Sequence, residues 1–370
     1  MFSLKQAITG ITIAIIIVII VVAGAIVAYY AISSQSGPTS HSTSSSTPTL
    51  ASSSSSSLSS SFSSPTIVSA SSSGALTPVT IGSAVAFSEV YYLPMIIAQE
   101  KGFWAQHGLE VTWQKFNGGP AETAALAAGQ IGIGLTGCGV IFDAVTRGIG
   151  IKNIGTYMNT TEFSIIVASN STIKTLNDLN GTTLAVTSTT GLEQAYAQIV
   201  ASKNHLHFNY VTTGGLPNSL ALVESGKAQA LDFTVGSVAS QIQSGLLRNV
   251  YNDSAALPTP WAEFCIAATN NFIQSNPTVL KEVDAAFSQT IQFILNNPSF
   301  AEQVVLNFTK SNSNVASLVY NSVKASWNPS LSIDATALTN VDNVYLKYGI
   351  TPNTNPASVN QTYTTEFLQS

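Results

Sequence analysis

Hydrophobic and polar residues follow one another along residues 79–270 in the rhythm of an α/β fold. Apolar runs of strand length, such as VTIGSAVAF at 79–87, alternate with helix-length segments that begin or end at Pro or Gly. Strands and helices that alternate in sequence usually form a parallel sheet with helices on its faces. The pattern therefore predicts the α/β fold class.

The clearest of these units is the stretch VYYLPMIIAQEKGFWAQHGLEV at 90–111. Pro suits the first helical turn and Gly suits the position just past a helix end. We therefore expect a helix from Pro94 to Gly102 and a short turn that ends at Gly108. A strand precedes this unit and another, 109–116, follows it. The polar loop Ser88-Glu89 then lies at the carboxyl end of the first strand, where ligands bind in open parallel sheets.

A second α/β rhythm begins at Ile173, and it predicts a second lobe. The apolar run FSIIVAS at 163–169 would lead out of the first lobe, and WAEFCIAATNNF at 261–272 would return to it. The remainder, from Pro277 to Tyr348, has helical periodicity. We expect lobe 1 to comprise 79–172 and 259–370, and lobe 2 to comprise 173–258.

The amino-terminal region has a different pattern. Residues Ile8 to Ile32 form one uncharged apolar segment, and Lys5 is the charge on its amino side. About 20 apolar residues span a bilayer, so we expect a retained membrane anchor with the bulk of the chain outside, a cleaved signal peptide being the alternative. Residues 33–78 are a Ser/Thr tract, typical of a disordered, O-glycosylated linker.

Composition and charge exclude one class of partner. Charged residues make up 8% of the chain, the net charge is −5, and no basic stripe is present, so nucleic acid is not an expected partner. With an outward-facing anchor, six N-x-Ser/Thr sequons favour an extracytoplasmic glycoprotein. They begin at Asn159, Asn170, Asn180, Asn252, Asn307 and Asn360.

Metal and cofactor motifs are weak. His205 and His207 have no Cys or acidic cluster beside them, and GIGLTG at 132–137 lacks the acidic residue of a dinucleotide site. We therefore predict no metal and no cofactor. His107 stands at a surface turn with no evident partner. Cys138 and Cys265 could pair outside the cell, but we expect two separate, small buried residues.

The candidate ligand contacts are the residues at the carboxyl ends of the predicted strands. In the first lobe these are Ser88, Glu89, Tyr91, Tyr92, Asn117, Gly118, Thr136, Gly137 and Cys138. The second lobe contributes Ser188, Thr189, Thr190, Gly191, Phe233 and Thr234, and the returning strand adds Trp261 and Glu263.

Three features of this set suggest its chemistry. Ser188-Thr189-Thr190 precedes a helix, whose amino terminus can hold an oxyanion, although a plain helix cap would need only one hydroxyl. Tyr91, Tyr92 and Trp261 would be flat pocket walls or ordinary packing. Glu89 would favour an amine, or be a solvated loop residue. No Lys or Arg is expected at a strand end, so we predict a neutral or mixed-polarity organic ligand rather than nitrate.

The helix at 94–111 resembles the signature of the ABC-transporter substrate-binding proteins for sulfonates, taurine, nitrate and thiamine precursors. The positions that match are Pro94, Ala98, Gly102, Phe103, Trp104, Gly108, Leu109 and Val111. GGPAETAALAAGQIGIGLTG, IKTLNDLNGTTLAVTSTTG and SLALVESGKAQALDFTV resemble the family's next three elements, so the match extends from Val79 to about Phe287. Gly132 and Gln229 stand where the family usually has Asp.

The resemblance implies a two-lobed fold of the type II periplasmic-binding-protein kind, with two crossover strands and the ligand between the lobes. It implies a monomeric receptor that delivers a small molecule to an ABC permease and its ATPase by lobe closure, with no catalytic step. One alternative is an enzyme like the thiamine-pyrimidine synthases of this superfamily, whose chemistry relies on a cysteine-rich motif and a His. The other is a ligand-sensing ectodomain that acts through a partner.

Overall fold

The computed structural model describes residues 75–84, 90–116, 119–187, 192–351 and 356–368, all within one compact unit, Ser71–Ser370. The expected anchor at 8–32 and almost all of the expected linker lie outside these residues. The first strand begins at Thr77, so the folded part starts two residues before the expected Val79. Among the helices of the described segments, none has the length and apolar character needed to cross a bilayer.

The first sheet has five strands in the order β2-β1-β3-β10-β4. Strands β1, β2 and β3 are parallel to one another, while β10 runs antiparallel to both of its neighbours, β3 and β4. The strands are β1 (Thr77–Ser83), β2 (Leu109–Lys115), β3 (Ile133–Gly137), β4 (Ile151–Met158) and β10 (Phe264–Thr269).

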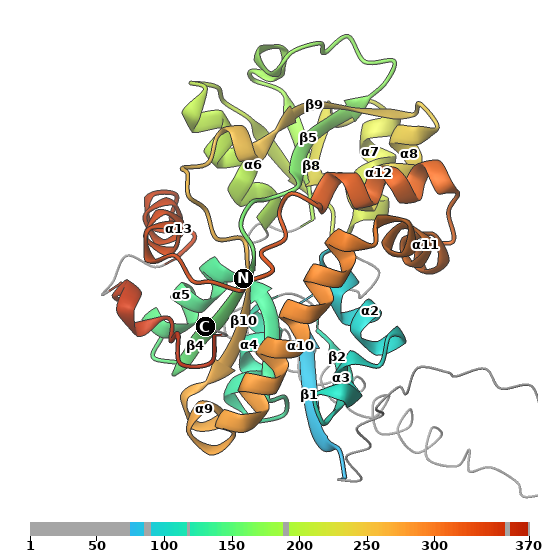
Figure 1. The fold of residues 1–370 in the computed structure, drawn as a ribbon. Helices are drawn as coiled ribbons and strands as arrows, with labels where there is room; N and C mark the ends of the chain where they lie inside the picture. The colour runs from blue at the N-terminus through green and yellow to red at the C-terminus, as the bar shows by residue number, and fades with distance from the viewer. Residues whose placement is uncertain (1–74, 85–89, 117–118, 188–191, 352–355, 369–370) are drawn as a thin grey trace, which may run out of the picture. The chain divides into compact units, whose positions relative to one another are not determined.

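The second sheet repeats this plan with the order β7-β6-β8-β5-β9. Here β6 is parallel to β7 and β8, and β5 runs antiparallel to β8 and β9. The strands are β5 (Phe163–Ala168), β6 (Thr183–Val186), β7 (Asn209–Thr212), β8 (Ala230–Thr234) and β9 (Leu247–Asn252). Figure 1 shows β5, β8 and β9 grouped with the helices of the second lobe.

Three details differ from the expectations. Each sheet is mixed rather than parallel, because the strand that follows each crossover between the lobes enters its sheet in the opposite direction. Strand β5 pairs entirely within the second sheet, so that sheet starts at Phe163, ten residues before the expected boundary at Ile173. Strand β9 was missed, since its sequence LRNVYN has little apolar character for an edge strand.

Helices of the first lobe follow the punctuation of the sequence. Helix α2 (Leu93–Glu100) has Pro94 in its first turn and ends before Gly102, which has φ of 69°. Helix α3 (Phe103–Gln106) ends before Gly108, at φ of 70°. Because non-glycine residues are strained at positive φ, these two glycines confirm the predicted helix and turn. The lobe also contains 3₁₀ helix η1 (Val90–Tyr92), α4 (Gly119–Ala127) and α5 (Cys138–Thr146).

The second lobe has short helices between its strands. They are η2 (Leu176–Leu179), α6 (Leu192–Lys203), α7 (Leu216–Glu224), η3 (Gly236–Val238), α8 (Ala239–Gln243) and η4 (Asp253–Ala255). Helix α6 packs on β8 and β5, α7 on β6 and β8, and α8 on β9. This arrangement covers the hydrophobic strands from the predicted helical positions.

The chain ends in a helical segment, as its periodicity predicted. It comprises α9 (Asn270–Ser275), α10 (Pro277–Asn296), α11 (Pro298–Thr309), α12 (Ser313–Val323), α13 (Ala335–Lys347) and η5 (Val359–Gln361). Helix α10 packs on α2 and α3, α13 packs on α5, and α12 contacts both η1 and the second-lobe elements η3 and α8.

His107 connects α3 to this segment. Its Nδ1 lies 3.0 Å from a carboxylate oxygen of Glu282, and its Nε2 lies 2.9 Å from Oε1 of Gln289, both on α10. The sequence showed no partner for His107, because these residues are more than 170 positions away along the chain.

Candidate functional site

Three parallel strands of the first sheet, β1, β2 and β3, end at one edge, and the candidate residues of the first lobe follow them. Ser88, Glu89, Asn117 and Gly118 lie outside the described residues. Tyr91 and Tyr92 belong to the hydrophobic core. The Tyr92 hydroxyl donates to the Leu135 carbonyl at 3.4 Å, and Tyr91 stacks on Phe264 with ring centroids 4.6 Å apart. Both tyrosines therefore pack behind this edge.

Thr136, Gly137 and Cys138 end β3 and begin α5, and all three are buried. A Cβ atom on Gly119 would lie 3.4 Å from the Thr136 hydroxyl, so the start of α4 meets the end of β3. The first residue of α4 and the end of β3 are thus neighbours.

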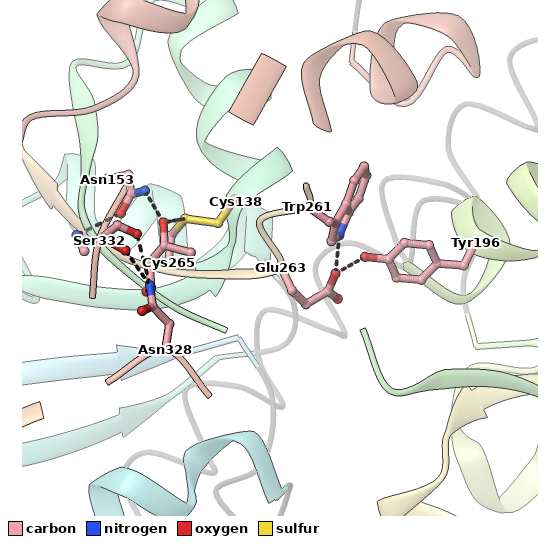
Figure 2. Close-up of a disulfide and its surroundings, with 10 residues drawn as sticks. Cys138, Asn153, Tyr196, Trp261, Glu263, Cys265, Asn328 and Ser332 are labelled. Carbon is pink, nitrogen blue, oxygen red and sulfur yellow. Dashed lines mark hydrogen bonds between the residues drawn. A yellow bond between two sulfur atoms is a disulfide. The ribbon is translucent and has the colours of Figure 1, made fainter. Parts of the chain in front are cut away.

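The expectation that Cys138 and Cys265 are separate residues was wrong. They form a disulfide with Cα atoms 5.2 Å apart (Figure 2). The antiparallel register places Cys265 opposite Thr136 and Phe264 opposite Gly137, which brings Cys138 next to Cys265. Cys138 therefore contributes backbone and a disulfide to this edge, and no thiol.

Four candidates of the second lobe, Ser188, Thr189, Thr190 and Gly191, lie outside the described residues and immediately precede Leu192, the first residue of α6. Phe233 and Thr234 end β8. Thr234 is buried and its hydroxyl donates to Ser237 at 2.6 Å. Phe233 is half-buried, and its ring centroid lies 6.3 Å from that of Phe163.

The strand ends of the two lobes face each other at two points. A Cβ atom on Gly137 would lie 3.9 Å from Cδ1 of Leu192, which joins β3 to α6. A Cβ atom on Gly236 would lie 3.0 Å from Cγ1 of Val90, which joins η3 to η1. Elements that carry or directly follow candidate residues of the two lobes are thus in contact.

Glu263 and Trp261 lie on the segment that returns from the second lobe. The indole N–H of Trp261 donates to Oε2 of Glu263 at 2.8 Å, and the hydroxyl of Tyr196 on α6 donates to the same oxygen (Figure 2). Burial raises the pKa of the Glu263 carboxyl to about 7, and the donors Tyr196 and Trp261 and the nearby Thr161 hydroxyl partly offset this rise. Tyr196 was not among the site residues predicted from the sequence, because it carries no motif within its helix.

A second carboxylate, that of Glu162, links the lobes on the outgoing segment, which leads from β4 to β5. Oε2 of Glu162 accepts hydrogen bonds from the Gly236 backbone N–H at 3.3 Å and from the Ser322 hydroxyl on α12 at 3.0 Å. Glu162 immediately precedes β5, so each segment between the lobes carries one buried, hydrogen-bonded glutamate. Neither the pairing with Gly236 nor that with Ser322 has a local signal in the sequence.

Further carboxyl groups are buried in both lobes. Burial raises the pKa of Glu122 on α4 to about 8, against the smaller opposing effects of the Leu135 backbone and the Thr136 hydroxyl. Asp232 on β8 and Asp253 on η4 are fully buried in the second lobe, and burial raises both pKa values. None of these three was among the site residues predicted from the sequence.

Basic groups are scarce here. Within the described part of the chain, the ion pairs are Arg147–Asp143 and His107–Glu282, both remote from the facing strand ends. One expectation needs correction, because Lys115 is the last residue of β2 and is exposed. In the same part of the chain, no three His, Cys, Asp or Glu side chains are grouped so that they could hold a metal ion.

A cavity of about 360 Å³ lies beside the two segments that connect the lobes. Trp261 and Pro260 line it from the returning segment, and Asn159 and Thr160 line it from the outgoing one. Of the described candidate residues, Trp261 alone contributes to its wall. The cavity therefore lies next to the facing strand ends and is not part of them.

Known proteins with the same organisation identify the fold. Residues 89–301 match the family model described as NMT1/THI5 like. A Brucella abortus protein with the provisional name of a binding protein is 24% identical over 223 residues, which cover 58% of this chain and 66% of that protein, just under two thirds of its length.

Two solved structures are similar throughout the folded unit. One is the alkanesulfonate-binding protein SsuA from Xanthomonas axonopodis pv. citri, with a TM-score of 0.65 and 15% identity, covering 79% of this chain and 100% of that one. The other is a Candida albicans gene product with the generic periplasmic binding protein fold, with a TM-score of 0.65 and 15% identity, covering 80% and 98%. These similarities show a two-lobed, periplasmic-binding-protein-like fold. Since the family model covers more than half of the 370 residues, the chain belongs to the NMT1/THI5-like family.

Proposed function

We propose that the protein is an extracytoplasmic solute-binding receptor that delivers a small organic ligand to an ABC importer. The observation that carries this proposal is the meeting of two sets of strand ends, from lobes joined by two connecting segments. Ligands of open α/β sheets bind at such strand ends, and hinged lobes close around a ligand by rotation at a few connecting residues. Closure would be the signal read by a separate permease and its ATPase.

The proposed location rests on three features. The apolar segment Ile8–Ile32 would anchor a monomer in the membrane, and the Ser/Thr tract would tether the folded unit. The disulfide Cys138–Cys265 fits an oxidising compartment. The asparagines of all six sequons are exposed, which is compatible with glycosylation.

The proposed ligand is a neutral or mixed-polarity organic molecule of the sulfonate, taurine or thiamine-precursor kind. An alkanesulfonate-binding protein shares the fold, and buried carboxyl groups outnumber basic ones near the facing strand ends. Ser188, Thr189 and Thr190 at the start of α6 would hold an oxyanion through hydroxyl and backbone donors. Glu89 would accept from an amine or amino-heterocycle.

A thermal-shift screen of the full chain tests the function. The panel comprises alkanesulfonates, taurine, pyrimidines, simple amines and nitrate. At a hundredfold excess over Kd, a ligand stabilises the folded state by about 2.7 kcal/mol, which corresponds to a shift of roughly 5 °C or more. A shift with an organic member supports the receptor. Absence of any shift would reject this ligand class, and a shift with nitrate alone would reject the ligand chemistry.

The role of the three hydroxyls is tested by the variant Ser188→Ala, Thr189→Ala, Thr190→Ala. If they bind the ligand, the ligand-induced shift disappears while the ligand-free melting temperature is nearly unchanged. A helix cap is worth about 1 kcal/mol. A loss of that size in the ligand-free protein, with the ligand-induced shift retained, would assign these residues to capping instead.

A further inference from the structure

Glu263 is fixed to the first lobe through its backbone. Its N–H donates to the Met158 carbonyl at 2.9 Å, and its carbonyl accepts from the Cys138 N–H at 2.9 Å. It directly precedes β10, whose Cys265 is linked to Cys138 by the disulfide. The backbone of Glu263 therefore cannot move without the ends of β3 and β4.

The side chain of Glu263 reaches the second lobe. Its Oε2 accepts from the Tyr196 hydroxyl on α6 as well as from the Trp261 indole (Figure 2). The Tyr196 ring lies 5.1 Å from Phe163 and 6.5 Å from Trp261, between centroids. All four side chains are buried, so the carboxyl is the polar centre of an apolar contact between the lobes.

Helix α6 carries this contact to the facing strand ends. Tyr196 is four residues after Leu192, and residues at this spacing lie on one face of a helix. Leu192 is the residue that approaches Gly137 at the end of β3. One face of α6 thus touches the first lobe at two points, one apolar at Leu192 and one hydrogen-bonded at Tyr196.

We propose that Glu263 is a positioning residue that sets how closely α6 approaches the β3 edge, and through that spacing the affinity for the ligand. The inference rests on the proposed receptor function. The Tyr196 hydrogen bond is present only when α6 lies against the first lobe, so it stabilises the closed arrangement over an open one. A hydrogen bond to a carboxylate is among the stronger ones that side chains form. Its loss shifts the lobes apart.

The test measures lobe separation in the full chain without ligand. Spin labels on Glu110→Cys in β2 and Glu224→Cys at the end of α7 report the distance between the lobes, because both positions are exposed and lie in different lobes. Tyr196→Phe should shift the distance distribution to longer values. The matched control is Thr290→Val, which removes a buried hydroxyl whose partner, the Ala286 carbonyl, lies on the same helix, α10. It should leave the distribution unchanged.

Conservative replacements at Glu263 separate positioning from packing. Glu263→Gln keeps an oxygen acceptor for Tyr196 and Trp261 and can turn its amide nitrogen to Thr161, so it should keep a near-wild-type distance. Glu263→Met has similar size and no such acceptor, so it should behave like Tyr196→Phe. If Tyr196→Phe fails to fold, Glu263→Met removes the same hydrogen bond from its acceptor side and is expected to lengthen the distance. Equal distances in Glu263→Met and wild type would overturn the proposal.

Ligand binding is measured separately on the same variants. Tyr196→Phe should weaken binding of a ligand found in the thermal-shift screen by about tenfold, and Thr290→Val by less than about twofold. If wild type binds no ligand while the label distances respond as expected, the receptor function fails and the positioning role stands. If a ligand binds but Tyr196→Phe and Thr290→Val give equal distances and equal affinities, the positioning role fails alone.

Discussion

The carboxyl groups of Asp232 on β8 and Asp253 on η4 face each other in the interior of the second lobe. Both residues have 0% exposure. Burial, followed by the charge of Asp253, raises the pKa of Asp232 well above its usual range. The pair therefore retains a proton at a pH where an exposed aspartate has lost it.

This pair predicts stability that falls as pH rises. A carboxyl whose pKa is raised by folding contributes its full stability below its unfolded pKa and loses it as pH rises through the folded pKa. Asp232→Asn, which cannot ionise and can still donate to Asp253, should raise the unfolding free energy at pH 8. One pKa unit corresponds to about 1.4 kcal/mol, so the unfolding free energy should rise by at least that amount at pH 8. This gain should disappear near pH 4. Denaturant unfolding from pH 4 to 8 measures it.

Asp178 is a control whose pKa shift has the opposite sign, so its contribution to stability should change with pH in the opposite direction. Hydrogen bonds from the backbones of Lys174 and Thr175, and from the Thr175 hydroxyl, lower its pKa. Asp178→Asn should destabilise the protein at neutral pH and have progressively less effect as pH falls below its usual range. A pH-independent effect of Asp232→Asn would contradict the assignment of the shared proton.

The disulfide predicts a large dependence on redox state. Cys138 and Cys265 are separated by 127 residues, and closing a loop of this length stabilises a protein by about 2–5 kcal/mol. The double variant Cys138→Ala, Cys265→Ala should melt well below wild type. Calorimetry of both proteins with and without a reductant provides the comparison, since the variant should be insensitive to it. Alkylation of both cysteines in the unreduced, unfolded wild type would disprove the bond.

Two glycines near the strand ends predict opposite outcomes. A Cβ atom on Gly139 would lie 2.1 Å from the Tyr345 ring, so Gly139→Ala should cost about 1–3 kcal/mol of stability through overpacking. A Cβ atom on Gly137 meets its nearest neighbour at 3.8 Å, and its φ of −60° suits any residue. Gly137→Ala should change the unfolding free energy by less than about 0.5 kcal/mol. Chemical denaturation measures the unfolding free energy of both variants. Similar losses in Gly139→Ala and Gly137→Ala would show that the close approach to Tyr345 does not determine the cost of the added methyl group.

The contacts of His107 predict a small coupling energy between α3 and α10. His107→Ala and Gln289→Ala should each destabilise the protein slightly, and the double variant should lose less than the sum of the two. A coupling of about 0.3–1 kcal/mol is expected for a partly exposed side-chain pair. Strict additivity of the two losses in a double-mutant cycle would mean that this contact contributes nothing.

Local signals predicted the elements of the fold well. Pro94, Gly102 and Gly108 mark the ends of α2 and α3 as expected. Such ends can be predicted because helix capping and positive φ depend on residues within one turn. The connecting strands FSIIVAS and WAEFCIAATNNF were also found, since both are apolar along their length. The strands that pair with them were not predicted. Strand β5 pairs with β8 and β9, and β10 pairs with β3 and β4, and these pairings depend on residues far away in the chain.

The chemistry of the candidate site was harder to predict for the same reason. Tyr196 and Glu263 are 67 positions apart, and their hydrogen bond exists only because α6 docks on the returning segment. Cys138 and Cys265 meet through the register of two antiparallel strands. Which contacts a ligand makes with Ser88, Glu89 and Ser188–Thr190 remains a prediction, as these residues lie outside the described part of the chain.

The position of β10 has a consequence for the order in which the protein folds. It lies between β3 and β4, inside the first sheet, although it follows the whole second sheet in the chain. During synthesis from the amino terminus, β4 therefore has no partner within its sheet until residues 264–269 have emerged. The second lobe, continuous from 163 to 252, is complete before that point. Domains generally fold as units as the chain emerges. The lobe inserted into the chain is thus the first that can become native, and the lobe that begins the chain is the last.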